Sequence, residues 1–271
     1  MTRAYVLGAV KACLLGSALL IFAGAPGLAQ AEETTKLTVA FKPYRLGSYT
    51  TVTSTLTFST TNGELPIPIT HFALRFPASL IFSTSSLGLA VCHPEDLEAK
   101  GIEGCSPNAQ IGTGRAVAEL PIGPELVQEE AKVAILKGPP VNGQAGILIY
   151  SVGKTPVSAE TLFQGEVLES ASFGELLETA VPLIPSLPGA GDVVVTQIQM
   201  SVGPAGLTYY LHEHGKTVPY HPRGLQVPET CPRGGFRFGL SVVLANGIVV
   251  PANDTIPCPT SHHHKHHRVG R

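Results

Sequence analysis

The chain has 271 residues and a formal net charge of −2. Only 14% of its residues are charged, 44% are hydrophobic, and none is tryptophan. The apolar fraction is enough for a sizeable core and argues against a disordered chain. A weakly acidic, aromatic-poor chain lacks the positive charge and the stacking platforms that nucleic-acid binding requires. We therefore predict a globular protein that does not bind nucleic acid.

The N-terminus has the pattern of a secretory signal peptide, residues 1–31. Arg3 and Lys11 precede the almost wholly apolar or small segment 12–28, and Ala29-Gln30-Ala31 gives a small-x-small cleavage site. Glycine and proline near the end of the apolar segment would break a helix before the roughly 20 residues that span a bilayer. We predict export to the cell envelope or the medium, with no transmembrane segment once the signal is removed.

Four cysteines follow the predicted signal: Cys92, Cys105, Cys231 and Cys258. An even number in an exported chain is typical of disulfides, and proximity in sequence favours Cys92–Cys105 and Cys231–Cys258. A zinc site is the alternative. It is the weaker one, because no two of the four cysteines have Cys-x-x-Cys spacing.

Alternation of apolar and polar residues predicts many short β-strands. Segment 51–59 places Val52, Leu56 and Phe58 on one face and threonines on the other, a period of two. The same period recurs at 72–76, 194–202 and 236–244, and further strands are expected at 37–42, 114–120, 131–137, 145–151, 162–168 and 207–211. Few segments have a helical pattern: 94–100 predicts two turns of helix, and 173–179 predicts one or two more.

The last two predicted strands form a hairpin. Asn246-Gly247 is the residue pair that favours a two-residue type I′ turn, and apolar residues flank it on both sides. That turn would place Cys258 opposite Gly235, four residues from Cys231. The chain after Cys231 must then fold back across the base of the hairpin, which the glycines permit.

Many short strands separated by Gly and Pro predict a mainly β fold, an antiparallel β-sandwich that is Ig-like or jelly-roll-like and stapled by disulfides. Segment 121–130 is rich in Pro, Gly and acidic residues, which is typical of either a linker or a surface loop. We favour two packed sandwiches, 32–125 and 126–260. A disordered, basic, His-rich tail follows at 261–271.

Three segments around the cysteines resemble elements of a known group of proteins. Cys105-Ser106-Pro107-Asn108-Ala109-Gln110-Ile111-Gly112 resembles Cys-Pro-x-x-Ser/Ala-x-Ile-Gly, with Ser-Pro in place of Pro. Cys231-Pro232-Arg233-Gly234-Gly235 and Thr255-Ile256-Pro257-Cys258-Pro259 resemble a C-terminal Cys-Pro-x-Gly-Gly and Thr-x-x-Pro-Cys-Pro pair. Together they are similar to uncharacterised secreted proteins of actinobacteria. The resemblance implies an exported β-sandwich with no established activity.

The sharpest candidate for a chemical site is a group of histidines. His212 and His214, at i and i+2 on a predicted strand, would point to one face and bind one metal ion. His221 supplies a third ligand after a turn, leaving an open coordination position as in catalytic zinc sites. The alternative is two solvent-exposed histidines before a Gly215-Lys216 turn.

Two other patterns carry less chemistry. Ser151-Val152-Gly153-Lys154 matches the Ser-x-x-Lys of penicillin-recognising enzymes, but it follows a strand instead of lying on a helix, so we interpret it as a strand-end turn.

The tail holds five candidate metal ligands: His262, His263, His264, His266 and His267. Such a tract binds zinc weakly, and it becomes cationic in mild acid, where it would adhere to anionic cell-wall polymers.

We predict that the protein is exported and non-catalytic, with a role in binding, adhesion or wall architecture and no required cofactor. The alternative is a metal-binding protein or metal-dependent enzyme centred on His212, His214 and His221, with zinc as its metal.

Overall fold

The computed structural model describes residues 32–78, 80, 87–155, 158–170, 173–187 and 189–259. The described chain is mainly β, with antiparallel strand pairs and two disulfides, which confirms the predicted fold class. The predicted signal peptide and the histidines of the tail lie outside the described residues. Among the described residues, no helix has the length and apolar character needed to cross a membrane.

Short strands follow one another through the whole described chain. In chain order they are β1 (Glu33–Lys42), β2 (Tyr49–Thr60), β3 (Ile69–Phe76), β4 (Gln110–Ile122), β5 (Glu125–Lys137), β6 (Ala145–Gly153), β7 (Ala159–Glu169), β8 (Glu175–Ala180), β9 (Val194–Val202), β10 (Tyr209–Glu213), β11 (Lys216–Tyr220), β12 (Leu225–Gln226), β13 (Phe236–Leu244) and β14 (Val249–Ile256). The helical segments α1 (Pro94–Lys100), η1 (Gly101–Gly104) and η2 (Pro107–Ala109) lie between β3 and β4.

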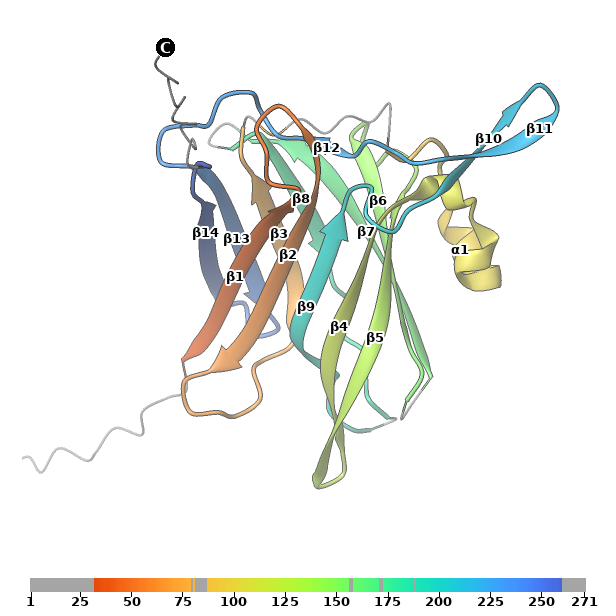
Figure 1. Cartoon of the computed structure of the whole chain (residues 1–271). Helices are drawn as coiled ribbons and strands as arrows, with labels where there is room; N and C mark the ends of the chain where they lie inside the picture. Colours follow the sequence, from red (N-terminus) through yellow and green to blue (C-terminus); the bar gives the residue numbers. More distant parts are fainter. Residues whose placement is uncertain are drawn as a thin grey trace, which may run out of the picture. The chain divides into compact units, whose positions relative to one another are not determined.

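One antiparallel sheet contains most of these strands, in the order β1-β2-β9-β4-β5-β6-β7-β8-β3-β13-β14, with β12 added beside β2. The sheet curls until its two end strands, β1 and β14, lie side by side (Figure 1). A side chain joins them: the Val39 amide donates to Asp254 Oδ2 at 2.6 Å. The sheet is therefore nearly closed, and it encloses a continuous interior. The hairpin β10–β11 stands apart from it (Figure 1).

Aromatic rings fill the half of the interior that lies inside β1, β3 and β13. Phe41 packs edge-on against Phe236, with ring centroids 5.4 Å apart. Phe238 contacts both Phe41 and Phe76 at 6.0 Å. The inward face of β13 is almost wholly buried, which follows from its period-two pattern of apolar residues. This half of the interior is a packed core.

A second, smaller apolar cluster lies on the outer face of β5 and β6. Leu136, Leu148 and Tyr150 pack there against Leu97 of α1. The disulfide Cys92–Cys105 closes the segment that carries the helix, with the two Cα atoms 5.2 Å apart. Helix α1 has the bounds that the sequence predicted. It therefore covers the outside of the sheet and leaves the interior free.

The C-terminal hairpin differs by one residue from the predicted register. β13 pairs with β14 as Phe236↔Ile256 and Val243↔Val249, so the loop has three residues, 245–247. A type I′ turn needs positive φ at both central residues, and here Gly247 has φ +82° while Asn246 is not among the positive-φ residues. Extended to its base, this register places Cys258 opposite Gly234 instead of Gly235. The predicted bond Cys231–Cys258 is present, with Cα atoms 5.8 Å apart.

Two further predictions differ from the structure. Segment 121–130, for which a linker and a surface loop are both open from the sequence, comprises the end of β4, the turn and the first half of β5. The sheet interleaves strands from both sides of residue 125. The described residues, which come from both predicted sandwich regions, form one compact unit. Segment 173–179, expected to be helical, contributes strand β8, because pairing with β3 and β7 on its two sides outweighs a weak local preference.

Candidate functional site

Small residues line the other half of the interior, inside β4, β5, β6 and β7. The inward positions there include Ala116, Ala131, Gly153 and Ala159. In a closed sheet, inward side chains must fill the space between opposite walls, and side chains this short do not reach across it. The sequence pattern of these four strands therefore leaves this half of the interior open, whereas the Phe-rich half is packed.

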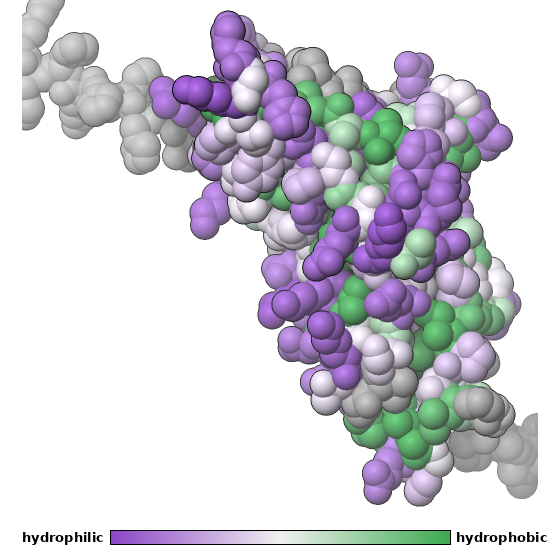
Figure 2. Space-filling view, turned by 90° about the vertical axis from the view of Figure 1, so that its right-hand side faces the viewer, coloured by the Kyte–Doolittle hydropathy of each residue, from purple (hydrophilic) through white to green (hydrophobic). Residues whose placement is uncertain are grey.

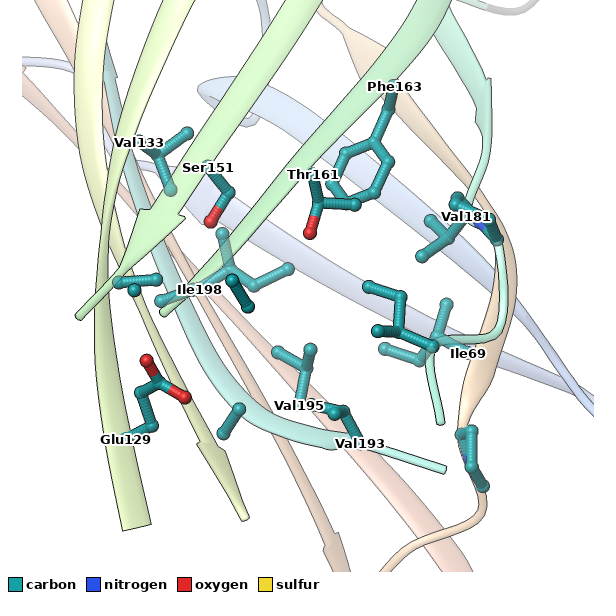
Figure 3. Close-up of a pocket in the computed structure, with 18 of the residues that line it drawn as sticks. Ile69, Glu129, Val133, Ser151, Thr161, Phe163, Val181, Val193, Val195 and Ile198 are labelled. Atoms are coloured by element: carbon teal, nitrogen blue, oxygen red, sulfur yellow. The ribbon is translucent and has the colours of Figure 1, made fainter. Parts of the chain in front are cut away.

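The result is a cavity of about 310 Å³ (Figure 3). Its remaining walls are mainly branched aliphatic side chains, among them Val133, Ile149, Val195 and Ile198, together with Phe163. These walls offer water few hydrogen-bond partners. An apolar molecule that displaces water from the cavity therefore gains by burying its own apolar surface, at about 25 cal/mol per Å².

The connection from β8 to β9 crosses one end of this cavity. We call residues 181–187 and 189–193 the strap; its first six residues and Val193 line the cavity. The strap is fixed to the opposite wall, because the Ser186 hydroxyl lies 2.7 Å from the Pro121 carbonyl oxygen. Leu183, a lining residue, is 45% exposed, so the cavity reaches the surface at the strap.

Apolar side chains gather at the end of the molecule where the β4–β5 hairpin ends (Figure 2). Leu126, just after the turn of that hairpin, is 56% exposed, and Leu187 of the strap is 39% exposed. Exposed leucines beside the entrance of an apolar cavity are typical of a site that takes up apolar molecules.

One carboxyl group faces this apolar space. Glu129 of β5 is 6% exposed, and its Oε1 has no hydrogen-bond partner within the described chain. The carboxyl rests against Gly153, where an added Cβ would lie 2.1 Å from Oε1. Burial raises the pKa of Glu129, and a hydrogen bond from the Thr155 backbone offsets part of that rise.

Two hydroxyls face the same space as the Glu129 carboxyl: Ser151 of β6 and Thr161 of β7, which pair across the sheet (Figure 3). Within the described part of the chain, neither hydroxyl takes part in a hydrogen bond. The cavity thus combines extensive apolar walls with a few oxygen-bearing side chains, namely Glu129, Ser151, Ser158, Thr161 and Ser186. That is the usual composition of a site for a small organic molecule.

The histidines predicted to bind a metal are not brought together. β10 pairs with β11 as Tyr209↔Tyr220 and His212↔Thr217, so His221 lies opposite residue 208. At about 3.4 Å per residue, that is about 14 Å along the strand from His212. His214 lies in the turn with φ +50°, which breaks the alternation that would have aligned it with His212. No group of three metal-ligating side chains occurs among the described residues.

We predict no stoichiometric zinc in the body of the protein. After equilibration with zinc and gel filtration, mass spectrometry of residues 32–259 should find far less than one zinc ion per chain, because His212 and His221 lie too far apart to share one. Residues 32–271 serve as the comparison, since their tail carries the other predicted ligands. Zinc retained by the shorter chain and lost in the variant His221→Ala would contradict this prediction.

The Ser151–Lys154 motif lies at the end of a strand, as predicted. β6 ends at Gly153, and Lys154 follows it in irregular structure. The lysine therefore is not placed one helical turn from the serine. Instead, Ser151 takes its place in the wall of the cavity.

A second buried carboxyl lies outside the cavity, at the start of β8. Glu175 pairs with Glu169 of β7, and its Oε2 is buried with no hydrogen-bond partner in the described chain. Burial raises the pKa of Glu175 to about 7, and the neighbouring charge of Glu169 adds to the rise. At neutral pH, this carboxyl is therefore close to half protonated.

This raised pKa predicts that stability falls as pH rises. The ordinary carboxyl pKa is 4.5, so between pH 5 and 7 the folded chain holds a proton that the unfolded chain does not. That contribution is complete at low pH and is lost as pH rises through 7. We expect wild type to lose about 1–2 kcal/mol relative to Glu175→Gln between pH 5 and pH 8. Urea unfolding at the two pH values measures it, with Glu130→Gln as control; parallel pH profiles for wild type and Glu175→Gln would contradict it.

Glu129 was not among the candidate site residues of the sequence analysis, because its segment was interpreted as a linker or loop. A usable signal was present. Along a strand, Glu129 lies on the same face as Ala131 and Val133, because the three positions are two residues apart. Extending the predicted strand 131–137 by two residues toward the N-terminus therefore places a carboxyl on the apolar face.

Comparison of the chain with protein-family models, with curated proteins and with solved structures found no match.

Proposed function

We propose that the protein is an exported, non-catalytic binding protein that takes an apolar small molecule into the cavity inside β4–β7 and β9. One observation carries the proposal: about 310 Å³ of space with mainly apolar walls inside an otherwise well-packed sheet. Pockets of this size and lining are typical of small-molecule binding sites. Of the roles the sequence suggested, binding is the one that the cavity supports.

Export is supported by three features together. These are the signal-peptide pattern, the resemblance to secreted actinobacterial proteins, and the disulfides, which persist in oxidising compartments. If the chain is exported as proposed, mass spectrometry of protein recovered from the medium or the cell envelope should find a new N-terminus at Glu32.

Titration with N-phenyl-1-naphthylamine tests ligand binding. This neutral dye is weakly fluorescent in water and bright in apolar surroundings. We expect saturable enhancement with one dye per chain in protein lacking residues 1–31. Protein unfolded in urea with its disulfides reduced is the control, because its cavity is gone. The absence of saturable enhancement with the folded protein would overturn the proposal.

A further inference from the structure

We infer that the molecule bound in this cavity carries a hydrogen-bond donor, a hydroxyl or an amine, on an apolar body, and that Glu129 accepts this hydrogen bond. The inference rests on the proposed function and specifies its ligand class.

The unpartnered oxygen of Glu129 is the first reason. Oε1 is buried and makes no hydrogen bond in the described chain, although a carboxyl oxygen is a strong acceptor. A buried acceptor left without a partner destabilises the structure, so a molecule that donates to it binds more tightly than one that only fills the space. An occupant with a donor thus supplies what the protein itself leaves out.

The placement of the carboxyl is the second reason. Gly153 on the neighbouring strand leaves room that a side chain would occupy, since a Cβ there would meet Oε1 at 2.1 Å. The Thr155 backbone lies beside the carboxyl and favours its charged form, which lowers its pKa. Glu129 is therefore held facing the cavity, instead of turning out to water like the adjacent Glu130, which is exposed.

The charge of the cavity is the third reason. Among the described residues that line it, Glu129 is the only ionisable side chain. A ligand carboxylate would meet this acidic group with no lysine, arginine or histidine to balance it, which is unfavourable in a low-dielectric site. Ser151 and Thr161 can donate or accept, so they do not select between ligand types. Fatty acids are therefore disfavoured, whereas alcohols and amines fit.

A matched set of small molecules tests this ligand class by displacement of N-phenyl-1-naphthylamine. Octan-1-ol and heptyl methyl ether have the same atoms, but only the alcohol donates a hydrogen bond; octylamine and octanoate complete the set. We expect the alcohol or the amine to displace the dye at a concentration at least tenfold lower than the ether or octanoate requires. Whichever of octan-1-ol and octylamine displaces the dye at the lower concentration shows whether a hydroxyl or an ammonium group suits the site better.

The variant Glu129→Met tests the role of the carboxyl, with Glu130→Met on the exposed face of the same strand as control. In Glu129→Met the tenfold preference for donors should disappear while the dye still binds, and in Glu130→Met it should persist. The comparison of alcohol with ether in wild type needs no variant, so the inference stays testable if Glu129→Met fails to fold. Dye binding with equal displacement by alcohol, ether and octanoate would overturn the inference but leave the proposed function standing. No dye binding at all would overturn the proposed function.

Discussion

Replacing Phe238 with alanine is expected to lower the free energy of unfolding by about 3–5 kcal/mol. Phe238 is 1% exposed, and its ring contacts Phe41 of β1 and Phe76 of β3, both at 6.0 Å. Removing it therefore opens a void between strands that come from opposite ends of the chain. Because the surrounding rings are themselves held by the closed sheet, they cannot collapse into the space.

Urea unfolding followed by circular dichroism measures this loss. Ile248→Ala is the matched control, because Ile248 is a large apolar residue that is 52% exposed, directly before β14. It should change the stability by no more than about 0.5 kcal/mol. A loss below about 1 kcal/mol for Phe238→Ala would contradict the placement of the packed core in this half of the interior.

Filling the cavity with a larger side chain should not lower the free energy of unfolding, unlike Phe238→Ala, but it should weaken dye binding strongly. In Ala131→Leu, the larger side chain enters the cavity that Ala131 lines. We expect binding of N-phenyl-1-naphthylamine to weaken at least tenfold, because the dye and the new side chain compete for one volume. The free energy of unfolding should stay the same or rise, since more apolar surface is buried.

Lys132→Leu is the control for this variant. It introduces the same side chain at the next position of β5, on the exposed outer face. Its dye affinity should match that of wild type. If Ala131→Leu bound the dye as tightly as Lys132→Leu, the dye would have to bind elsewhere on the molecule.

The strand content could be predicted from the sequence because period-two alternation is a local signal. Segment 51–59 and segment 236–244 each carry enough alternating apolar residues to identify a strand and its buried face without any knowledge of the partners. The disulfide pairs were predictable for a similar reason, since both join cysteines close in sequence.

Strand β8 and the closure of the sheet could not be predicted in this way. The residues of β8 alternate only weakly between apolar and polar. They form a strand because β3 and β7 pair with them on both sides, and β3 lies far away in the sequence. The interleaved strand order that brings β9 between β2 and β4 is likewise set by long-range pairing. A sandwich of two units and one nearly closed sheet have the same local patterns.

The cavity is a property of the closed sheet, so no single segment predicts it. Ala116, Ala131 and Ala159 are ordinary small residues in their own strands, and only the sheet brings them around one space. For the histidines, a local pattern predicted a site that the fold does not form. His212 and His214 have suitable spacing for a metal site, but the turn between β10 and β11 separates their directions.

Nuclear magnetic resonance tests most directly whether the binding site lies inside the sheet, by locating the dye on protein labelled at valine, isoleucine and leucine methyl groups. We predict nuclear Overhauser effects from bound N-phenyl-1-naphthylamine to the methyl groups of Val133, Ile149 and Ile198, which line the cavity. The methyl groups of Leu240 and Val242 in the packed half should show none. Effects confined to exposed Ile248 and Val249 would place the dye on the surface and contradict a binding site inside the sheet.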